Sequence, residues 1–196
     1  MKRVLLLSCF LFFAGKAFCQ QLEYALPQPE KWGKEKIAFP IEFAPLIPFK
    51  GMEEIRFTPG WGDIKSEDYW SYTFVWFVEG APVISRDSLK QYLSQYYTGL
   101  YFANQKESPT GDRDFTHVQA TKIAAANADK DTYEVKIATV NFLTKQALAL
   151  NGRIHVRRYQ AINRTALLIE ISPKDYKHPV WMGMDNIVSE FKAGGE

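Results

Sequence analysis

The side chains best suited to acid–base or metal chemistry are spread along the chain without a catalytic spacing. The three histidines, His117, His155 and His178, never lie three or four residues apart, so the helical spacing of a zinc site is absent. No G-x-S-x-G motif occurs, and Gly60 and Gly62 lack the lysine and helix start of a phosphate-binding loop. We therefore expect no metal and no cofactor, and the catalytic residues of any enzymatic activity are unknown.

Three cationic side chains share one face of a predicted strand, because Arg153, His155 and Arg157 alternate along it. Such a row is suited to hold a carboxylate, sulfate or phosphate through charge-assisted hydrogen bonds. The competing interpretation is a strand face whose cations pair with neighbouring acids of the same chain. The spacing alone leaves both interpretations open.

Aromatic residues are the most unusual part of the composition, at 15% of the chain with 5 tryptophans and 10 tyrosines. Large rings bury much area at little entropic cost and are frequent in binding sites. Trp61 lies between two glycines in a loop, where packing rarely requires a tryptophan, and Tyr69 begins the next predicted strand. We predict a ligand-binding surface at Trp61 and Tyr69, extended by the cationic row; the alternative is that the rings fill a core.

Acidic residues cluster in the same loop, at Asp63, Glu67 and Asp68, but their spacing fits no calcium loop. Asp63 and Glu67, together with His155, are the loose candidates for a hydrolase acting on an envelope or polysaccharide substrate. That alternative requires Asp63, Glu67 and His155 to converge in one pocket.

Residues 1–19 have the pattern of a cleavable signal peptide. Lys2 and Arg3 supply the basic start, Val4 to Ala14 the apolar run, and Ala17 and Cys19 the small residues before the cut. Lipid anchoring through Cys19 is disfavoured by Lys16 and Phe18. We expect a periplasmic or secreted protein that begins at Gln20, with no transmembrane segment in the mature chain.

Cleavage would change both the charge and the cysteine content. The full chain has 24 basic and 22 acidic residues, and the leader carries three of the basic ones but no acid, which leaves a net charge near −1. A near-neutral protein lacks the basic bias of nucleic-acid binding. Both cysteines, Cys9 and Cys19, lie in the leader, so disulfides and thiol catalysis are not expected in the mature chain.

The first half of the mature chain predicts an arm, two strands and a helix. Residues 20–50 contain five prolines among apolar side chains, which indicates an extended arm with a short edge strand around 36–43. Strands are expected over 53–58 and 69–78, separated by a loop over 59–68. A helix over 85–102 that packs on a sheet is predicted by apolar residues spaced three or four positions apart: Leu89, Tyr92, Leu93, Tyr96, Tyr97 and Leu100.

The second half predicts four strands and a closing helix. The strands are expected over 117–126, 133–142, 147–159 and 165–172, the helix over 181–192, and a frayed tail over 193–196. Asn151-Gly152 is either a hairpin turn or a bulge in one long strand; a turn at Thr144-Lys145-Gln146 favours the second.

This order predicts an α+β domain over 51–192, an antiparallel sheet of about five to seven strands with two helices packed on it. The order resembles that of PsbP-like domains, in which early strands and a helix precede a meander and a C-terminal helix. The ending Ile187-Val188-Ser189-Glu190-Phe191-Lys192 is similar to the ending of such chains. The resemblance spans about residues 53–192 and implies a fold but no activity. A cystatin-like or other helix-on-sheet fold is the main alternative.

The sequence therefore predicts an exported domain of a bacterial envelope whose role is to bind, not to catalyse. Its partner would be a small molecule, a glycan or an envelope protein, and not a nucleic acid. The alternatives are the hydrolase and a structural accessory subunit whose partner covers the arm. The oligomeric state is not predicted.

Overall fold

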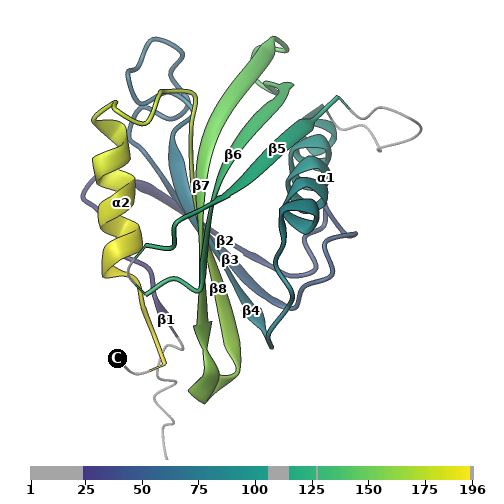
Figure 1. Cartoon of the computed structure of the whole chain (residues 1–196). Helices are drawn as coiled ribbons and strands as arrows, with labels where there is room; N and C mark the ends of the chain where they lie inside the picture. Colours follow the sequence, from purple (N-terminus) through teal and green to yellow (C-terminus); the bar gives the residue numbers. More distant parts are fainter. Residues whose placement is uncertain (1–23, 106–114, 127, 195–196) are drawn as a thin grey trace, which may run out of the picture.

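The computed structural model describes residues 24–105, 115–126 and 128–194 (Figure 1). The predicted signal peptide lies outside these residues. Within them the fold is a seven-stranded antiparallel sheet covered by one helix on each face, with a separate two-stranded sheet. The predicted α+β class, with two helices on an antiparallel sheet, is confirmed.

The large sheet has the strand order β2-β3-β4-β8-β7-β6-β5, and every neighbouring pair is antiparallel. Its strands span Gly33–Ala38 (β2), Gly51–Phe57 (β3), Tyr72–Glu79 (β4), His117–Ile123 (β5), Asp131–Val140 (β6), Ala147–Tyr159 (β7) and Arg164–Ser172 (β8). β4 and β8 lie in the middle, which explains why the side chains of both strands are apolar on both faces.

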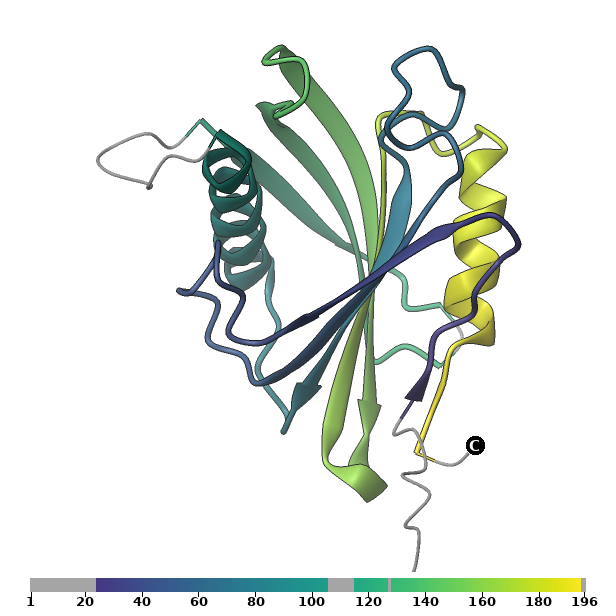
Figure 2. The ribbon, with the colours of Figure 1, turned by 180° about the vertical axis from the view of Figure 1, so that it is seen from behind.

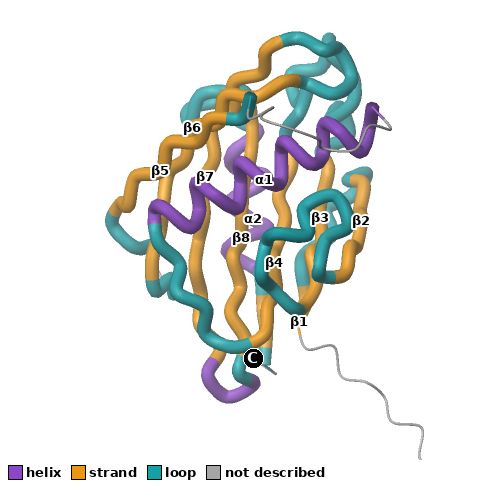
Figure 3. The backbone as a smooth tube through the Cα atoms, turned by 90° about the vertical axis from the view of Figure 1, so that its right-hand side faces the viewer, coloured by secondary structure: helices purple, strands orange, loops and turns teal. Residues whose placement is uncertain are grey.

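Helix α1 (Arg86–Gln105) covers one face of this sheet and α2 (Val180–Glu190) covers the other, with α1 running diagonally across the strands in Figure 3. The small sheet pairs β1 (Tyr24–Ala25) with β9 (Lys192–Ala193), so the two ends of the described chain lie side by side. A short 3-10 helix, η1 (Gln160–Ile162), leads into the turn between β7 and β8.

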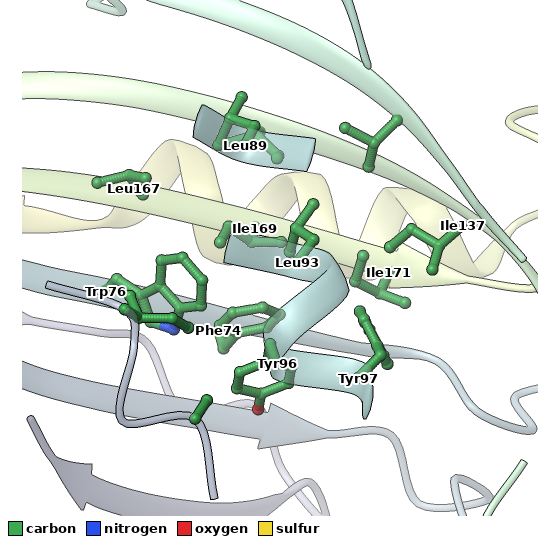
Figure 4. Close-up of a cluster of buried hydrophobic side chains, with 14 of the residues drawn as sticks. Phe74, Trp76, Leu89, Leu93, Tyr96, Tyr97, Ile137, Leu167, Ile169 and Ile171 are labelled. Carbon is green, nitrogen blue, oxygen red and sulfur yellow. The ribbon is translucent and has the colours of Figure 1, made fainter. Parts of the chain in front are cut away.

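The core between α1 and the sheet is the larger of the two layers. Leu89, Leu93, Tyr96 and Tyr97 of α1 face side chains such as Phe74 and Ile169 of the sheet in Figure 4. The predicted helical face is therefore correct, and it packs on a sheet as expected. On the other face, Val75, Phe77 and Leu168 pack against Ile187, Val188 and Phe191.

The edge strand lies earlier than predicted, at 33–38 instead of around 36–43. The chain leaves the sheet after residue 38 because a proline has no backbone N–H to donate to a strand, and Pro40, Pro45 and Pro48 follow. Residues 39–50 form irregular turns, and their Ile41 and Ile47 are buried in the core on the α1 face. The segment approaches the helix closely at Gly99, where a Cβ would lie 1.8 Å from the carbonyl oxygen of Phe43.

Asn151-Gly152 is neither a hairpin turn nor a bulge. Gly152 pairs in register with Val135 on one side and Ile171 on the other, inside the continuous strand β7. A Cβ at this position would lie 2.7 Å from Val135 Cγ2 and 2.8 Å from Ile171 Cδ1. The glycine is therefore explained by the side chains of the two neighbouring strands, which leave no room for a Cβ. The chain turns where Thr144-Lys145-Gln146 predicted it, between β6 and β7.

Candidate functional site

A cavity of about 450 Å³ opens where the C-terminal part of α1 separates from the sheet. The elements around it are β2, β3, β4, the loop before β4, α1 and the turn between β6 and β7. Figure 2 shows the ribbons of α1 and β2 from behind the view of Figure 1. The lining residues are Glu35, Ile37, Phe43, Ile55, Phe57, Trp61, Trp70, Tyr72, Tyr96, Leu100, Ala103, Asn104, Phe142 and Leu143.

The loop that carries Trp61 and Trp70 is held closed by its own backbone. The amide of Trp70 donates to the carbonyl of Trp61 at 2.9 Å, and the amide of Thr58 donates to the carbonyl of Ser71 at 3.2 Å. Gly60 permits the close return of Ser66, whose Oγ would lie 1.8 Å from a Cβ there. Trp70 takes a left-handed backbone conformation (φ 53°), which interrupts the extended chain. The strand that was predicted from residue 69 therefore begins at Tyr72.

Aromatic rings form one continuous wall of the cavity. Trp61 stacks on Trp70 with ring centroids 5.3 Å apart, and Trp70 contacts Phe142 at 5.0 Å. Phe57 of β3 contacts Trp61 at 4.8 Å. The wall therefore combines a loop, a strand and a distant turn, which no local sequence pattern could reveal.

Two hydrogen-bond donors in this wall have no partner. The Nε1 atoms of Trp61 and Trp70 are both buried, and neither donates to any acceptor in the described part of the chain. Trp70 is only 2% exposed. A buried donor without an acceptor costs about 1–3 kcal/mol, so these two indole groups lower the stability of the wall.

Behind the cavity lies a buried carboxyl group, Glu53, which sequence reasoning missed. Tyr96 donates to its Oε1 at 2.6 Å and Trp76 donates to its Oε2 at 3.1 Å. Burial raises the pKa of Glu53 to about 7, although these two hydrogen bonds act in the opposite direction. The signal that could have found it is its alternation with Ile55 and Phe57, which places an acid on the core face of β3.

Tyr69, the second predicted binding residue, supports the cavity without lining it. Its ring packs 5.8 Å from that of Trp70, and its hydroxyl accepts a hydrogen bond from Nδ2 of Asn141. Asn141 directly precedes Phe142, so Tyr69 connects the loop before β4 with the turn between β6 and β7.

The cationic row lies on the opposite face of the sheet, beneath α2. His155 contacts Asp129 Oδ2 at 2.6 Å through Nδ1 and Glu170 Oε2 at 3.3 Å through Nε2. Arg157 Nε donates to Asp129 Oδ1 at 2.9 Å, and its Nη1 donates to the carbonyl of Val188 at 2.8 Å. The predicted row exists, but the carboxylates that it holds belong to the chain itself.

The outer end of the row is Arg153, which binds Asp185 of α2 at 2.7 Å and lies 3.6 Å from Glu170. Its guanidinium also lies over the rings of Tyr176 and Trp181, 5.3 and 5.7 Å from their centroids. These contacts hold α2 and the segment before it on the sheet. The structure does not bring the row together with Trp61 and Tyr69.

Burial and ion pairing act against each other on His155. Burial alone would lower the pKa of the imidazole, but the hydrogen bonds and charges of Asp129 and Glu170 outweigh it and raise the pKa to about 9. The ring is therefore protonated at neutral pH and donates from both nitrogens. His155 and Arg157 are 5% and 8% exposed, so this ion network is buried beneath α2.

The three hydrolase candidates do not meet. The carboxylate of Glu67 is exposed and pairs with Lys174 at 3.0 Å and His178 at 3.3 Å. Asp63 accepts a hydrogen bond from the amide of Lys65 within its own loop. His155 lies beneath α2, where it contacts Asp129 and Glu170. No group of three or more His, Cys, Asp or Glu in the described residues is arranged to hold a metal ion. No helix of the described chain has both the length and the hydropathy to cross a membrane.

Comparisons with known proteins place the chain in no family. No protein-family model and no curated protein matches it. A crystal structure of LpqN, which is involved in cell envelope biogenesis of Mycobacterium tuberculosis, aligns with 86% of this chain and 82% of its own length, at 11% identity and a TM-score of 0.34. A likeness at this level transfers no function, so function is argued from the cavity.

Proposed function

We propose that this chain is an exported, non-enzymatic binding protein whose ligand occupies the cavity between α1 and the sheet. The observation that carries this proposal is an open cavity of about 450 Å³ with an aromatic wall that includes Trp61 and Trp70. Small-molecule sites typically enclose about 300–1,000 Å³ and combine an apolar lining with a few polar groups.

A core filled by aromatic rings would not leave open space beside them. Trp61 and Trp70 stack on each other with ring centroids 5.3 Å apart, and the cavity lies next to the wall that they form. The binding role predicted for Arg153, His155 and Arg157 remains a prediction, and the proposal does not depend on it.

Export is supported by the pattern of residues 1–19 alone. The proposal expects Gln20 as the N-terminus of the protein recovered from its native cell. An N-terminus at Met1 would contradict it, and a lipidated Cys19 would place the protein on a membrane.

Binding is tested with Nile red, a neutral dye whose emission rises and shifts to the blue in apolar surroundings. We expect saturable binding to the wild type and at least tenfold weaker binding to Ala103→Trp. Ala103 is exposed on α1 at the edge of the cavity, so the larger side chain obstructs the opening without disturbing the core.

The matched control is Gln91→Trp, which adds the same ring at an exposed position of the same helix away from this cavity. Its binding curve should coincide with that of the wild type. A wild type without saturable binding, or an Ala103→Trp variant that binds as tightly as Gln91→Trp, would overturn the proposal.

A further inference from the structure

The buried carboxyl group of Glu53 lies directly behind the wall of the cavity between α1 and the sheet. We propose that binding of an apolar ligand in this cavity is linked to protonation of Glu53, an inference that rests on the proposed function. The ligand binds most tightly when Glu53 is neutral, and its affinity falls as the carboxyl group ionises.

Three residues that line the cavity adjoin Glu53 from three elements. Ile37 of β2 is its register partner, Ile55 is the next residue on the same face of β3, and Tyr96 of α1 donates to Oε1 at 2.6 Å. Trp76 of β4 donates to Oε2 at 3.1 Å. Glu53 is 0% exposed. The carboxyl group and the cavity therefore share the same side chains as neighbours.

The charges around Glu53 are divided between the two faces of β2 and β3. In the described part of the chain, the ionisable groups that face Glu53 are Glu35 of β2, Tyr72 of β4, and Tyr96 and Tyr97 of α1. Lys36, Glu54 and Arg56 lie on the other face, where they form ion pairs with one another. The charged side chains of the irregular segment 39–50 are exposed.

These surroundings disfavour the ionised form of Glu53. Burial, and to a smaller extent the charge of Glu35, raise the pKa of Glu53 to about 7, although the hydrogen bonds from Tyr96 and Trp76 act in the opposite direction. Both forms of the carboxyl group are therefore populated near neutral pH. Small changes in the surroundings of the group are sufficient to shift the balance between them.

An apolar ligand changes these surroundings in one direction. Water in an open cavity solvates a charge in the wall, and a ligand that displaces the water lowers the local dielectric constant. The ionised form of Glu53 loses more solvation than the neutral form, so the ligand raises the pKa of Glu53 further. Because linkage is reciprocal, the neutral form binds the ligand more tightly than the ionised form.

The test measures the dissociation constant of Nile red, which stays uncharged, at pH values between about 5.5 and 8.5, with circular dichroism confirming the fold at each pH. We expect the wild type to bind Nile red about fivefold or more tightly at the acidic end than at the basic end. Glu53→Gln keeps the shape of the side chain but cannot ionise, so its affinity should not change across the range.

Two further variants should shift the midpoint of the pH dependence in opposite directions. Tyr96→Phe keeps a ring in the wall but removes a hydrogen bond that favours the ionised form of Glu53, so the midpoint should move to higher pH. Glu35→Gln removes a negative charge that disfavours this form, so the midpoint should move to lower pH. A purely structural role of Glu53 would not produce these shifts, and they test the linkage even if Glu53→Gln does not fold.

Saturable Nile red binding with the same affinity at every pH would overturn the linkage and leave the proposed function standing. An affinity that rises with pH, or an equal pH dependence in the wild type and Glu53→Gln, would also overturn it. If Nile red does not bind at any pH, the proposed function fails, and the linkage fails with it.

Discussion

At the scale of single residues, two buried clusters with different chemistry lie on opposite faces of the sheet. On the α1 face, Glu53 is held by two neutral donors and has a pKa raised to about 7 by burial. On the α2 face, Asp129 and Glu170 enclose a protonated His155. The first cluster adjoins the cavity between α1 and the sheet, whereas the second connects β7 with α2 and is considered below for its effect on stability.

The His155 network makes stability depend on pH in a defined direction. Its folded-state pKa is about 9, against an ordinary value of 6.5. The contribution is fully present below about pH 6.5 and is lost as pH rises through about 9, because the folded state binds the proton more tightly than the unfolded chain. We expect the contribution of His155 to wild-type stability to fall by about 3 kcal/mol across this window.

This expectation is checked by urea unfolding of the wild type and of His155→Gln at several pH values between 6 and 10. The difference in unfolding free energy between the two proteins should be largest near pH 6 and shrink towards pH 10. A difference that is constant across the range would show that the imidazole charge does not contribute.

The partners of this network could not be predicted from the sequence. The alternation of Arg153, His155 and Arg157 correctly predicted a shared face, because strand periodicity is local. Asp129 lies in the connection before β6, and Glu170 comes from a neighbouring strand, so their positions depend on sheet order. An acid inside the apolar run of β8 was a visible signal that a buried cation would face it.

At the scale of elements, the fit between α1 and the irregular segment before β3 determines where the cavity begins. Gly99 lets the carbonyl of Phe43 approach the helix, and Phe43 then reaches both Tyr96, 5.2 Å away, and the cavity. The helix and its buried face were predictable from the 3.6-residue period. The close contact was not, since residues 39–50 have no period of their own.

Gly99→Ala should therefore be strongly destabilising. The added Cβ would lie 1.8 Å from a backbone oxygen, and overpacking of this kind typically costs about 1–3 kcal/mol, even though alanine is the better helix former. Thermal and urea unfolding measure the loss. The matched control is Gly62→Ala, where no atom lies within 4 Å of the new Cβ and no change beyond about 0.5 kcal/mol is expected. Equal stability of the two variants would contradict the packing described here.

At the scale of the whole molecule, the two covered faces divide structure from proposed function. The α2 face is closed by Arg153, His155 and Arg157, and by Phe191 next to the small sheet β1-β9. The α1 face is packed over most of its length but opens at the C-terminal end of the helix. The sequence predicted the antiparallel sheet and both helices. The cavity could not be predicted, because its opening is lined by Phe43, Trp61 and Phe142 from three loops that are far apart in the sequence.

The central claim is that a ligand enters the cavity beside Trp61 and Trp70, and indole NMR signals report this directly. The protein has 5 tryptophans, and each gives one indole N–H signal that Trp→Phe variants can assign. On titration with Nile red, the signals of Trp61 and Trp70 should move, because both residues line the cavity. The signal of Trp181, which packs beside Tyr176 on the α2 face, should stay in place. A titration that leaves the signals of Trp61 and Trp70 unmoved while Nile red binds saturably would contradict the account.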